Sequence, residues 1–269
     1  MSGRPVAILL AMVATALLLP AIFSHDRPPA PLAMDSAPAV SAPPLLERET
    51  ISMVPEAGIL HAPSLVDLGN GELLSVWYQG SREGRRDVTL YTSRFTSGRW
   101  EPATRVTDAA ATGAELGRYL NTIGNAVLLT RPHGELWLVY VSVSIGGWSG
   151  SSLNLKQSED GGRTWSKAMR LVTSPFFNLS TLVKGRPMVL TDGSPAIPAY
   201  HEMIAHLPEL LILNGAGQVT DKIRIGAAAG RLAIQPTLAV LPDNKVVALL
   251  RPTGATPRIF ESRSSDGGN

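Results

Sequence analysis

The segment SEDGGRTW, from Ser158 to Trp165, gathers side chains able to do chemistry at one place in the chain. Asp160 supplies a carboxylate, but the glycines after it tolerate positive φ, so turn amides can donate hydrogen bonds to that carboxylate. We therefore expect Asp160 to fold a turn rather than to react, and Trp165 to pack the turn onto its sheet. The residues assigned to this structural turn are Ser158, Asp160, Gly162, Thr164 and Trp165.

Other chemistries find little support in the sequence. The histidines form no metal-spaced pairs with acidic residues or with each other, so we expect no metal site. No glycine-rich phosphate loop follows a predicted strand, and we expect no cofactor. The net charge of +2 comes from scattered Lys and Arg residues without a basic run, which argues against a nucleic-acid partner.

The first residues predict export. Arg4 precedes an apolar segment from Pro5 to Phe23, whose length lies between a signal-peptide core and a minimal membrane span. Residues 1–24 are therefore a signal peptide, which we favour, or an N-terminal membrane anchor. We expect a periplasmic or extracellular protein that meets a membrane only through such an anchor. Residues 25–47 are rich in Pro and Ala and predict a linker, which leaves 48–269 as the folded domain.

Short β-rich runs dominate the folded domain. Examples are LLSVWYQG, LWLVYVSVS and KVVALL, and they alternate with turn segments such as GNGE, RPHGE and LPDNK. No long window sustains a helical apolar period, and AAATGAEL is expected to hold one helical turn. The domain contains no cysteine, so its core must stand without disulfides. The sequence predicts an all-β, antiparallel fold.

A repeated hairpin refines this prediction. Each of four segments places a small residue or proline before an apolar strand, a polar turn and a second strand. The register marks are Pro63, Ala126, Pro187 and Pro236. A period of about 50 to 60 residues suits a four-stranded propeller blade with its loops. A β-sandwich is the alternative, but its strands need not recur as matching hairpins.

The repeats and the turn together resemble a known family. SEDGGRTW resembles the Asp-box, S-x-D-x-G-x-T-W, of sialidases and bacterial-neuraminidase-repeat proteins. The segments HAPSLVDL and SREG before it, and QPTL and ALLR after it, resemble in their order the predicted-neuraminidase branch of that family. The resemblance implies a six-bladed propeller, a retaining glycosidase mechanism and three arginines that hold the carboxylate of sialic acid. It also implies an Asp general acid/base and a Tyr nucleophile activated by a Glu.

Carried over to this sequence, the resemblance gives catalytic candidates in the first repeat. His61 stands where the family has its first arginine; it binds an anion when protonated, or else it caps a strand. The acid/base falls in the loop QGSREGRRDVTL, where Glu83 and Asp87 are both available and the choice stays open. Arg82 in that loop is a substrate-binding candidate, and a solvated charged loop is the alternative.

Later repeats supply the substrate-binding candidates. Arg251 in VVALLRP matches the family's second arginine, and Arg258 is a nearby alternative. The Glu that would activate the nucleophile is replaced at Ala233. Inner strand starts of a propeller face the axis, which adds Asn125, Arg186 and Gln235 to the substrate-binding residues. Weaker candidates are Asn121, Tyr200, His201 and Glu202.

Four repeats are visible where the resemblance implies six. The final SSDGGN, Ser264–Asn269, is an Asp-box without its Thr-Trp. We expect about two further blades, carrying the third arginine and the nucleophile, and little activity from this chain alone.

Three functions remain open, all with a glycan partner. The first is an exported sialidase-like exo-glycosidase, the second is a non-catalytic glycan-binding or scaffolding propeller, and the third is a propeller enzyme for another uronic or deoxy sugar.

Overall fold

The computed structural model describes most of the predicted folded domain. Its described residues are 48–51, 58–175, 177–203, 205–226, 233–242, 245–253 and 258–266. The predicted signal peptide or anchor, the linker from 25 to 47, and the last three residues of SSDGGN lie outside them. Within the described ranges, no helix combines the length and the apolar character needed to span a membrane.

The described residues form four antiparallel sheets, which we call blades 1 to 4 in chain order. Blade 1 contains β1 (Ile59–Gly69), β2 (Glu72–Gly80), β3 (Thr89–Thr96), β4 (Arg99–Trp100) and β5 (Thr104–Asp108). Blade 2 contains β6 (Thr122–Thr130), β7 (Leu136–Val143), β8 (Ser151–Ser158) and β9 (Met169–Arg170). Blade 3 contains β10 (Thr181–Val183), β11 (Met188–Val189), β12 (Pro195–His201), β13 (Leu207–Leu213) and β14 (Val219–Arg224). Blade 4 contains β15 (Ala233–Val240), β16 (Val246–Pro252) and β17 (Phe260–Ser264).

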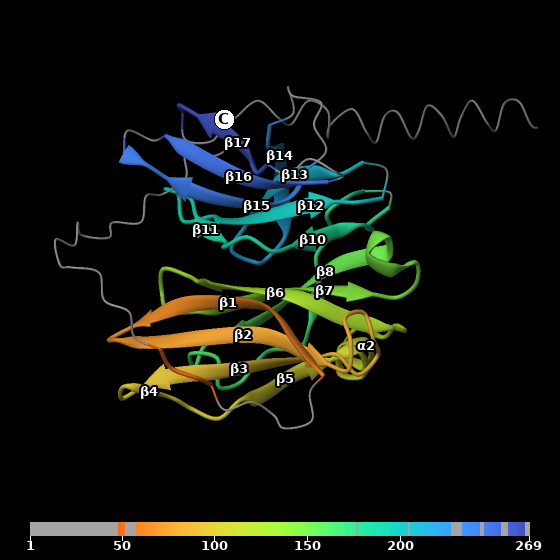
Figure 1. Ribbon diagram of the computed structural model, residues 1–269, viewed down its shortest axis with the longest axis vertical. Coiled ribbons are helices and arrows are strands. Elements are labelled where there is room, and N and C mark those ends of the chain that lie inside the picture. The colour runs from red at the N-terminus through yellow and green to blue at the C-terminus, as the bar shows by residue number, and fades with distance from the viewer. Residues whose placement is uncertain are drawn as a thin grey trace, which may run out of the picture.

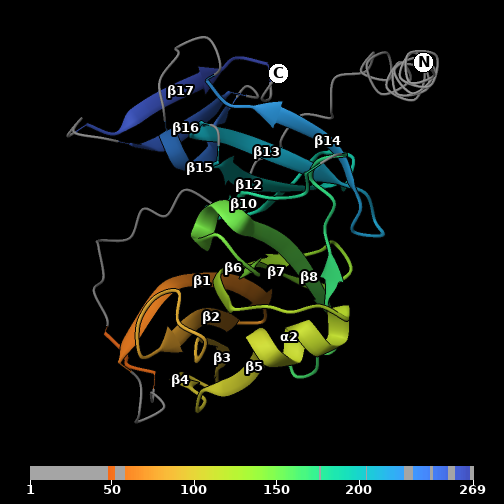
Figure 2. The ribbon, with the colours of Figure 1, turned by 90° about the vertical axis from the view of Figure 1, so that its right-hand side faces the viewer.

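The sheets follow one another as successive blades of a propeller (Figure 1, Figure 2). The first strand of each blade lies against the preceding blade, because β6 contacts β1, β10 contacts β8, and β15 contacts β12. Within each blade the chain then runs outward through hairpins. The predicted all-β propeller is thereby confirmed, and the alternative of two facing sheets is wrong.

Apolar side chains fill the spaces between blades. Blades 1 and 2 share a cluster that includes Leu74, Tyr78 and Leu136, and blades 2 and 3 share one that includes Trp137 and Tyr200. Smaller clusters join blades 3 and 4. Both faces of a blade between two others are covered, so a strand such as β7, with the sequence LWLVYVSV, is apolar along most of its length and does not alternate with polar residues. The core is therefore divided among the interfaces between blades.

One helix is longer than the sequence suggested. The segment AAATGAEL forms α2 (Ala109–Leu116), two turns rather than one, because the Asp108 side chain caps its first turn and Gly117 ends it in the left-handed conformation. Glu115 of this helix forms an ion pair with Lys156 of β8, which is 3% exposed. The helix thus ties the connection between blades 1 and 2 onto blade 2.

The inner strands share an irregularity near the point where they begin. Register shifts interrupt β1 between His61 and Ser64, β6 between Gly124 and Ala126, and β15 between Ile234 and Thr237. The residues inside these bulges, Ala62, Asn125 and Gln235, have φ values of +53°, +26° and +53°. A bulge bends the strand and redirects a side chain, and non-glycine residues with positive φ concentrate at functional sites.

Candidate functional site

The bulges mark one end of the propeller, which we call the axial mouth. Here each inner strand begins and the next strand of the same hairpin ends, as the pairs His61 with Tyr78 and Ile234 with Arg251 show. Polar side chains from all four blades lie at this end. The axial cluster consists of His61, Tyr78, Glu83, Asn125, Lys184, Tyr200, Glu202, Gln235 and Arg251.

Tyr78 forms the floor of the cluster on blade 1. Its side chain is fully buried, and the His61 ring meets it edge to face with centroids 5.4 Å apart. Among the described residues no group meets the Tyr78 hydroxyl in good hydrogen-bond geometry, although the Glu83 side chain lies close to it. Burial and the nearby Glu83 carboxylate raise the pKa of Tyr78 well above its ordinary value, so its phenol is neutral at pH 7.

Tyr200 occupies a comparable position on blade 3. Asn125 Nδ2 donates a hydrogen bond to the Tyr200 hydroxyl at 3.4 Å, so blades 2 and 3 meet at this oxygen. Burial raises the pKa of Tyr200 to about 12, although hydrogen bonds with Gln235 and Asn125 oppose the shift. The two bulged amide side chains thus hold a buried tyrosine in place.

Two cations approach each other across blades 3 and 4. Arg251 Nη1 donates to Gln235 Oε1 at 3.3 Å, and Lys184 directly follows β10. The backbone of Gly185 in blade 3 approaches that of Pro236 in blade 4 so closely that a Cβ added to Gly185 would lie 2.0 Å from the Pro236 carbonyl oxygen. Burial, together with the charge of Arg251, lowers the pKa of Lys184, whereas Glu83 across the axis opposes the shift. Neither cation has a carboxylate within ion-pair distance in the part of the chain that is described.

The carboxyls around these cations differ in environment. Glu202 is half-buried just after β12, and burial raises its pKa against the opposing charges of His206 and Arg251. Glu83 is exposed in the loop after β2, within electrostatic range of Tyr78 and Lys184. A carboxyl whose pKa is raised by burial and a second, exposed carboxyl near a cation are groups suited to acid and base roles.

Asp87, the alternative to Glu83, has a local task. Its carboxylate accepts hydrogen bonds from the Ser81 amide at 2.8 Å and the Ser81 hydroxyl at 3.1 Å, which close the loop after β2. The same hydrogen bonds lower the pKa of Asp87, so it is a poor proton donor. The remaining predicted binding residues, Arg82, Arg186 and Arg258, have exposed side chains, as does Arg251. Exposure therefore does not separate them from the cluster.

The SEDGGRTW turn lies at the opposite end of its blade. Ser158 ends β8 and pairs with Leu136, the first residue of β7, whereas the axial mouth lies at the other end of β7. The Asp160 carboxylate accepts hydrogen bonds from the Thr164 hydroxyl at 2.6 Å, the Thr164 amide at 2.9 Å and the Arg163 amide at 3.0 Å. These contacts hold the pKa of Asp160 well below its ordinary value.

This turn also joins two blades. The Gly161 carbonyl accepts a hydrogen bond from Arg94 of blade 1, and a Cβ on Gly162 would lie 2.6 Å from Leu74 Cδ2 of the same blade. Trp165 packs against the apolar cluster between blades 1 and 2. The turn therefore fastens blade 2 onto blade 1, far from the axial cluster.

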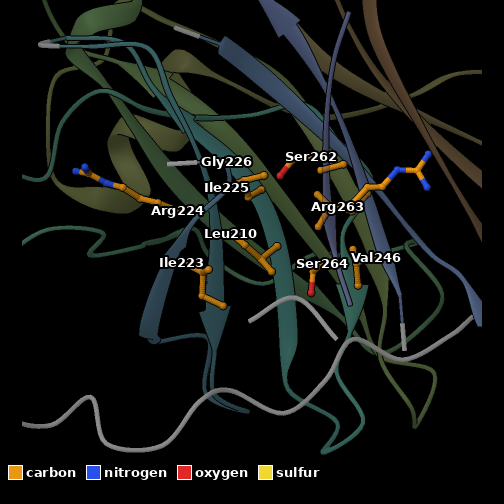
Figure 3. A pocket seen from close by; sticks show the side chains of 11 residues that line it. Leu210, Ile223, Arg224, Ile225, Gly226, Val246, Ser262, Arg263 and Ser264 are labelled. Carbon is orange, nitrogen blue, oxygen red and sulfur yellow. The ribbon is translucent and has the colours of Figure 1, made fainter. Parts of the chain in front are cut away.

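A separate pocket lies away from the axial cluster. The pocket in Figure 3, about 220 Å³, lies between the outer strands of blades 3 and 4 and is lined mainly by apolar residues such as Leu210, Ile223 and Val246. It contains no member of the axial cluster. Among the described residues, no three His, Asp or Glu side chains gather in a group able to hold a metal ion.

The radial blades and the SEDGGRTW turn define an Asp-box propeller of the sialidase type. Residues 71–269 match the BNR repeat-like domain family, and the chain belongs to this family. The predicted resemblance is confirmed. No curated protein sequence matches the chain.

Solved structures share the fold at low sequence identity. A protein of unknown function from Dyadobacter fermentans has a TM-score of 0.62 and 16% identity, with 78% of this chain and 66% of that chain covered. A Hadza microbial sialidase has a TM-score of 0.58 and 18% identity, with coverages of 78% and 45%. The leech intramolecular trans-sialidase has a TM-score of 0.60 and 14% identity, with coverages of 83% and 52%. The chain thus spans between 45% and 66% of the length of these structures, and the similarity shows the fold alone.

Sequence reasoning missed part of the cluster. Tyr78 and Lys184 were not among the candidates, and Tyr200 and Glu202 were only weak ones. Tyr78 lies near the end of the predicted strand LLSVWYQG and pairs with His61, so hairpin register was a usable signal. Lys184 had no such signal, because its place depends on the close approach of Gly185 to blade 4.

Proposed function

We propose that the chain is part of an exported, sialidase-like exo-glycosidase that releases a terminal acidic sugar, such as sialic acid, from glycans. The observation that carries the proposal is the convergence of Lys184 and Arg251 from neighbouring blades, with no carboxylate ion-paired to either among the described residues. Unpaired cations that are held together attract an anionic ligand. The family and the fold support a glycosidase-type propeller around this site.

The substrate carboxylate is assigned to these two cations. The planar guanidinium of Arg251 offers two parallel donors to a carboxylate, and Gln235 fixes its orientation at 3.3 Å. Lys184 adds a point charge where desolvation strengthens the attraction. His61 stands where the resemblance implies the family's first arginine, and in this assignment Lys184 supplies part of the positive charge which that arginine would bring.

Proton transfer is assigned to the carboxyl groups. Glu202 serves as general acid, because its raised pKa keeps a proton available closer to neutral pH. Glu83 stabilises the positive charge that develops on the sugar ring as the glycosidic bond breaks. Tyr78 and Tyr200 have raised pKa values and are neutral phenols at pH 7, so they shape the site and do not act as nucleophiles.

One observation favours a second function, glycan binding without turnover. Ala233 stands where the resemblance implies the Glu that activates the nucleophile, and its side chain is 1% exposed at the start of β15. A site that holds the acidic sugar but lacks this carboxylate would recognise a glycan without cleaving it.

The test combines binding and turnover. Calorimetric titration with N-acetylneuraminic acid measures recognition, and a fluorogenic sialoside measures hydrolysis. Arg251→Ala and Lys184→Ala should each weaken binding about tenfold or more. The matched control is Arg99→Ala, an exposed arginine at the far end of blade 1. Glu202→Gln should reduce hydrolysis while binding persists.

The outcomes separate the two functions. Binding with turnover supports the glycosidase, and binding without turnover supports the recognition module. If Arg251→Ala binds the sugar as tightly as Arg99→Ala does, the assignment of the axial cluster is wrong.

A further inference from the structure

A polar pocket opens over blade 3, near the end of the propeller that holds the axial cluster. It lies between the segment that leads into β10 and the outer strands β13 and β14, with a volume of about 240 Å³. Its lining includes Phe177, His201, Glu209, Lys222 and Arg224, and we call it the blade 3 pocket. None of these residues belongs to the axial cluster.

A buried carboxylate lines this pocket. The Glu209 residue is 4% exposed, and its Oε2 lies 3.2 Å from Lys222 Nζ in an ion pair. In the described part of the chain, no donor reaches that oxygen in hydrogen-bond geometry. A buried carboxylate oxygen without a hydrogen bond is costly, and a ligand hydroxyl entering the pocket would supply the missing donor.

An exposed aromatic ring borders the same pocket. Phe177 is 76% exposed and belongs to none of the apolar clusters between the blades. Ligand sites combine aromatic contact surface with a few placed polar groups. A pyranose ring has this dual character, since its C–H face is apolar and its edge carries hydroxyls.

The other polar groups complete the match. Burial lowers the pKa of His201, so its neutral imidazole offers one donor and one acceptor. Lys222 and Arg224 are donors, and Glu209 is an acceptor. Sugar hydroxyls both donate and accept, so they can satisfy such a mixed set. The carboxylate of Glu209 also offsets part of the positive charge, which makes this pocket less suited to an anion than the axial cluster.

The pocket and the axial cluster meet at the end of β12, where consecutive side chains point to opposite faces of the sheet. His201 lines the pocket, whereas its neighbours Tyr200 and Glu202 belong to the cluster. We propose that the blade 3 pocket binds a neutral pyranose unit of a glycan whose terminal acidic sugar occupies the axial cluster. The proposal rests on the proposed function only for that terminal sugar.

The test is saturation-transfer NMR with the full chain and a mixture of lactose, cellobiose and xylobiose. At least one of these neutral disaccharides should receive saturation. Phe177→Ala should weaken the signal about threefold to tenfold through loss of ring contact. The matched control is Val172→Ala, because Val172 is 64% exposed on the same segment and does not line the pocket.

Parallel titrations with N-acetylneuraminic acid keep the two proposals apart. Arg251→Ala should lose the acidic sugar and keep the neutral disaccharide, whereas Phe177→Ala should keep the free acidic sugar. No saturation transfer to any of the three disaccharides overturns the blade 3 pocket, as does an equal signal in Phe177→Ala and Val172→Ala. Loss of the disaccharide in Arg251→Ala overturns it too, because that sugar would then occupy the axis.

Discussion

The contact between the Asp-box turn and the preceding blade can be tested by one methyl group. Gly162 has φ of +87°, and a Cβ there would lie 2.6 Å from Leu74 Cδ2, 3.3 Å from Trp165 and 3.4 Å from Leu136. Gly162→Ala therefore introduces two separate costs. One is the backbone strain of an L-residue at positive φ, about 1–2 kcal/mol. The other is overpacking between blades, about 1–3 kcal/mol.

A matched glycine isolates the second cost. Gly134, in the turn between β6 and β7 of the same blade, has φ of +82° and no atom within 4 Å of its built Cβ. Gly134→Ala should therefore carry the strain alone, about 1–2 kcal/mol. The free energy of unfolding, measured by urea titration with tryptophan fluorescence, should fall further for Gly162→Ala, by about 1–3 kcal/mol.

A third variant assigns the difference to blade 1. In a Leu74→Ala background the clashing methyl groups are absent, so adding Gly162→Ala should cost about as much as Gly134→Ala does. If Gly162→Ala and Gly134→Ala destabilise the protein equally, the turn does not press on Leu74, and the packing of blade 2 on blade 1 is wrong.

Three further predictions concern buried groups and the turn. The pKa of Tyr200 is raised from 10.0 to about 12, so its contribution to the unfolding free energy is complete below pH 10 and is lost as the pH rises to 12. This loss is about 1.4 kcal/mol per pH unit, and Tyr200→Phe should remove it. Unchanged pH profiles in urea would contradict its burial. Asp160→Asn should lower the thermal midpoint and flatten its fall with acid below about pH 4, because the lowered pKa of Asp160 gives stability that is lost on protonation, while sugar binding stays as in the wild type. Weaker sugar binding would contradict its place at the far end of the blade. Glu115→Ala should cost about 3–5 kcal/mol of unfolding free energy, since Lys156 would keep a buried charge without its partner. Lys156→Met should cost less, and the reverse order would refute the argument.

The fold was largely predictable because its signals are local. Turn segments such as GNGE and RPHGE separate the strands of each hairpin, and their recurrence predicted the blades. The register marks Pro63 and Pro236 lie inside inner-strand bulges, and Ala126 is the residue at which pairing resumes after one. Helix α2 was underestimated because the buried partner of Glu115 depends on a tertiary contact, although its caps at Asp108 and Gly117 are local signals.

The site was less predictable because it depends on how blades meet. Resemblance placed Arg251 at a strand end, and the structure adds Gln235 as its partner. The choice between Glu83 and Asp87 stayed open in the sequence, since the Ser81 hydrogen bonds that occupy Asp87 cannot be read from spacing. Lys184 reaches the axis only through the contact of Gly185 with blade 4.

The most direct measurement is a crystal structure of the chain with N-acetylneuraminic acid bound. The axial cluster predicts the sugar carboxylate between Arg251 and Lys184, with the ring close to Glu83 and Glu202. A sugar bound elsewhere on the propeller, or a carboxylate that contacts neither cation, would contradict the account.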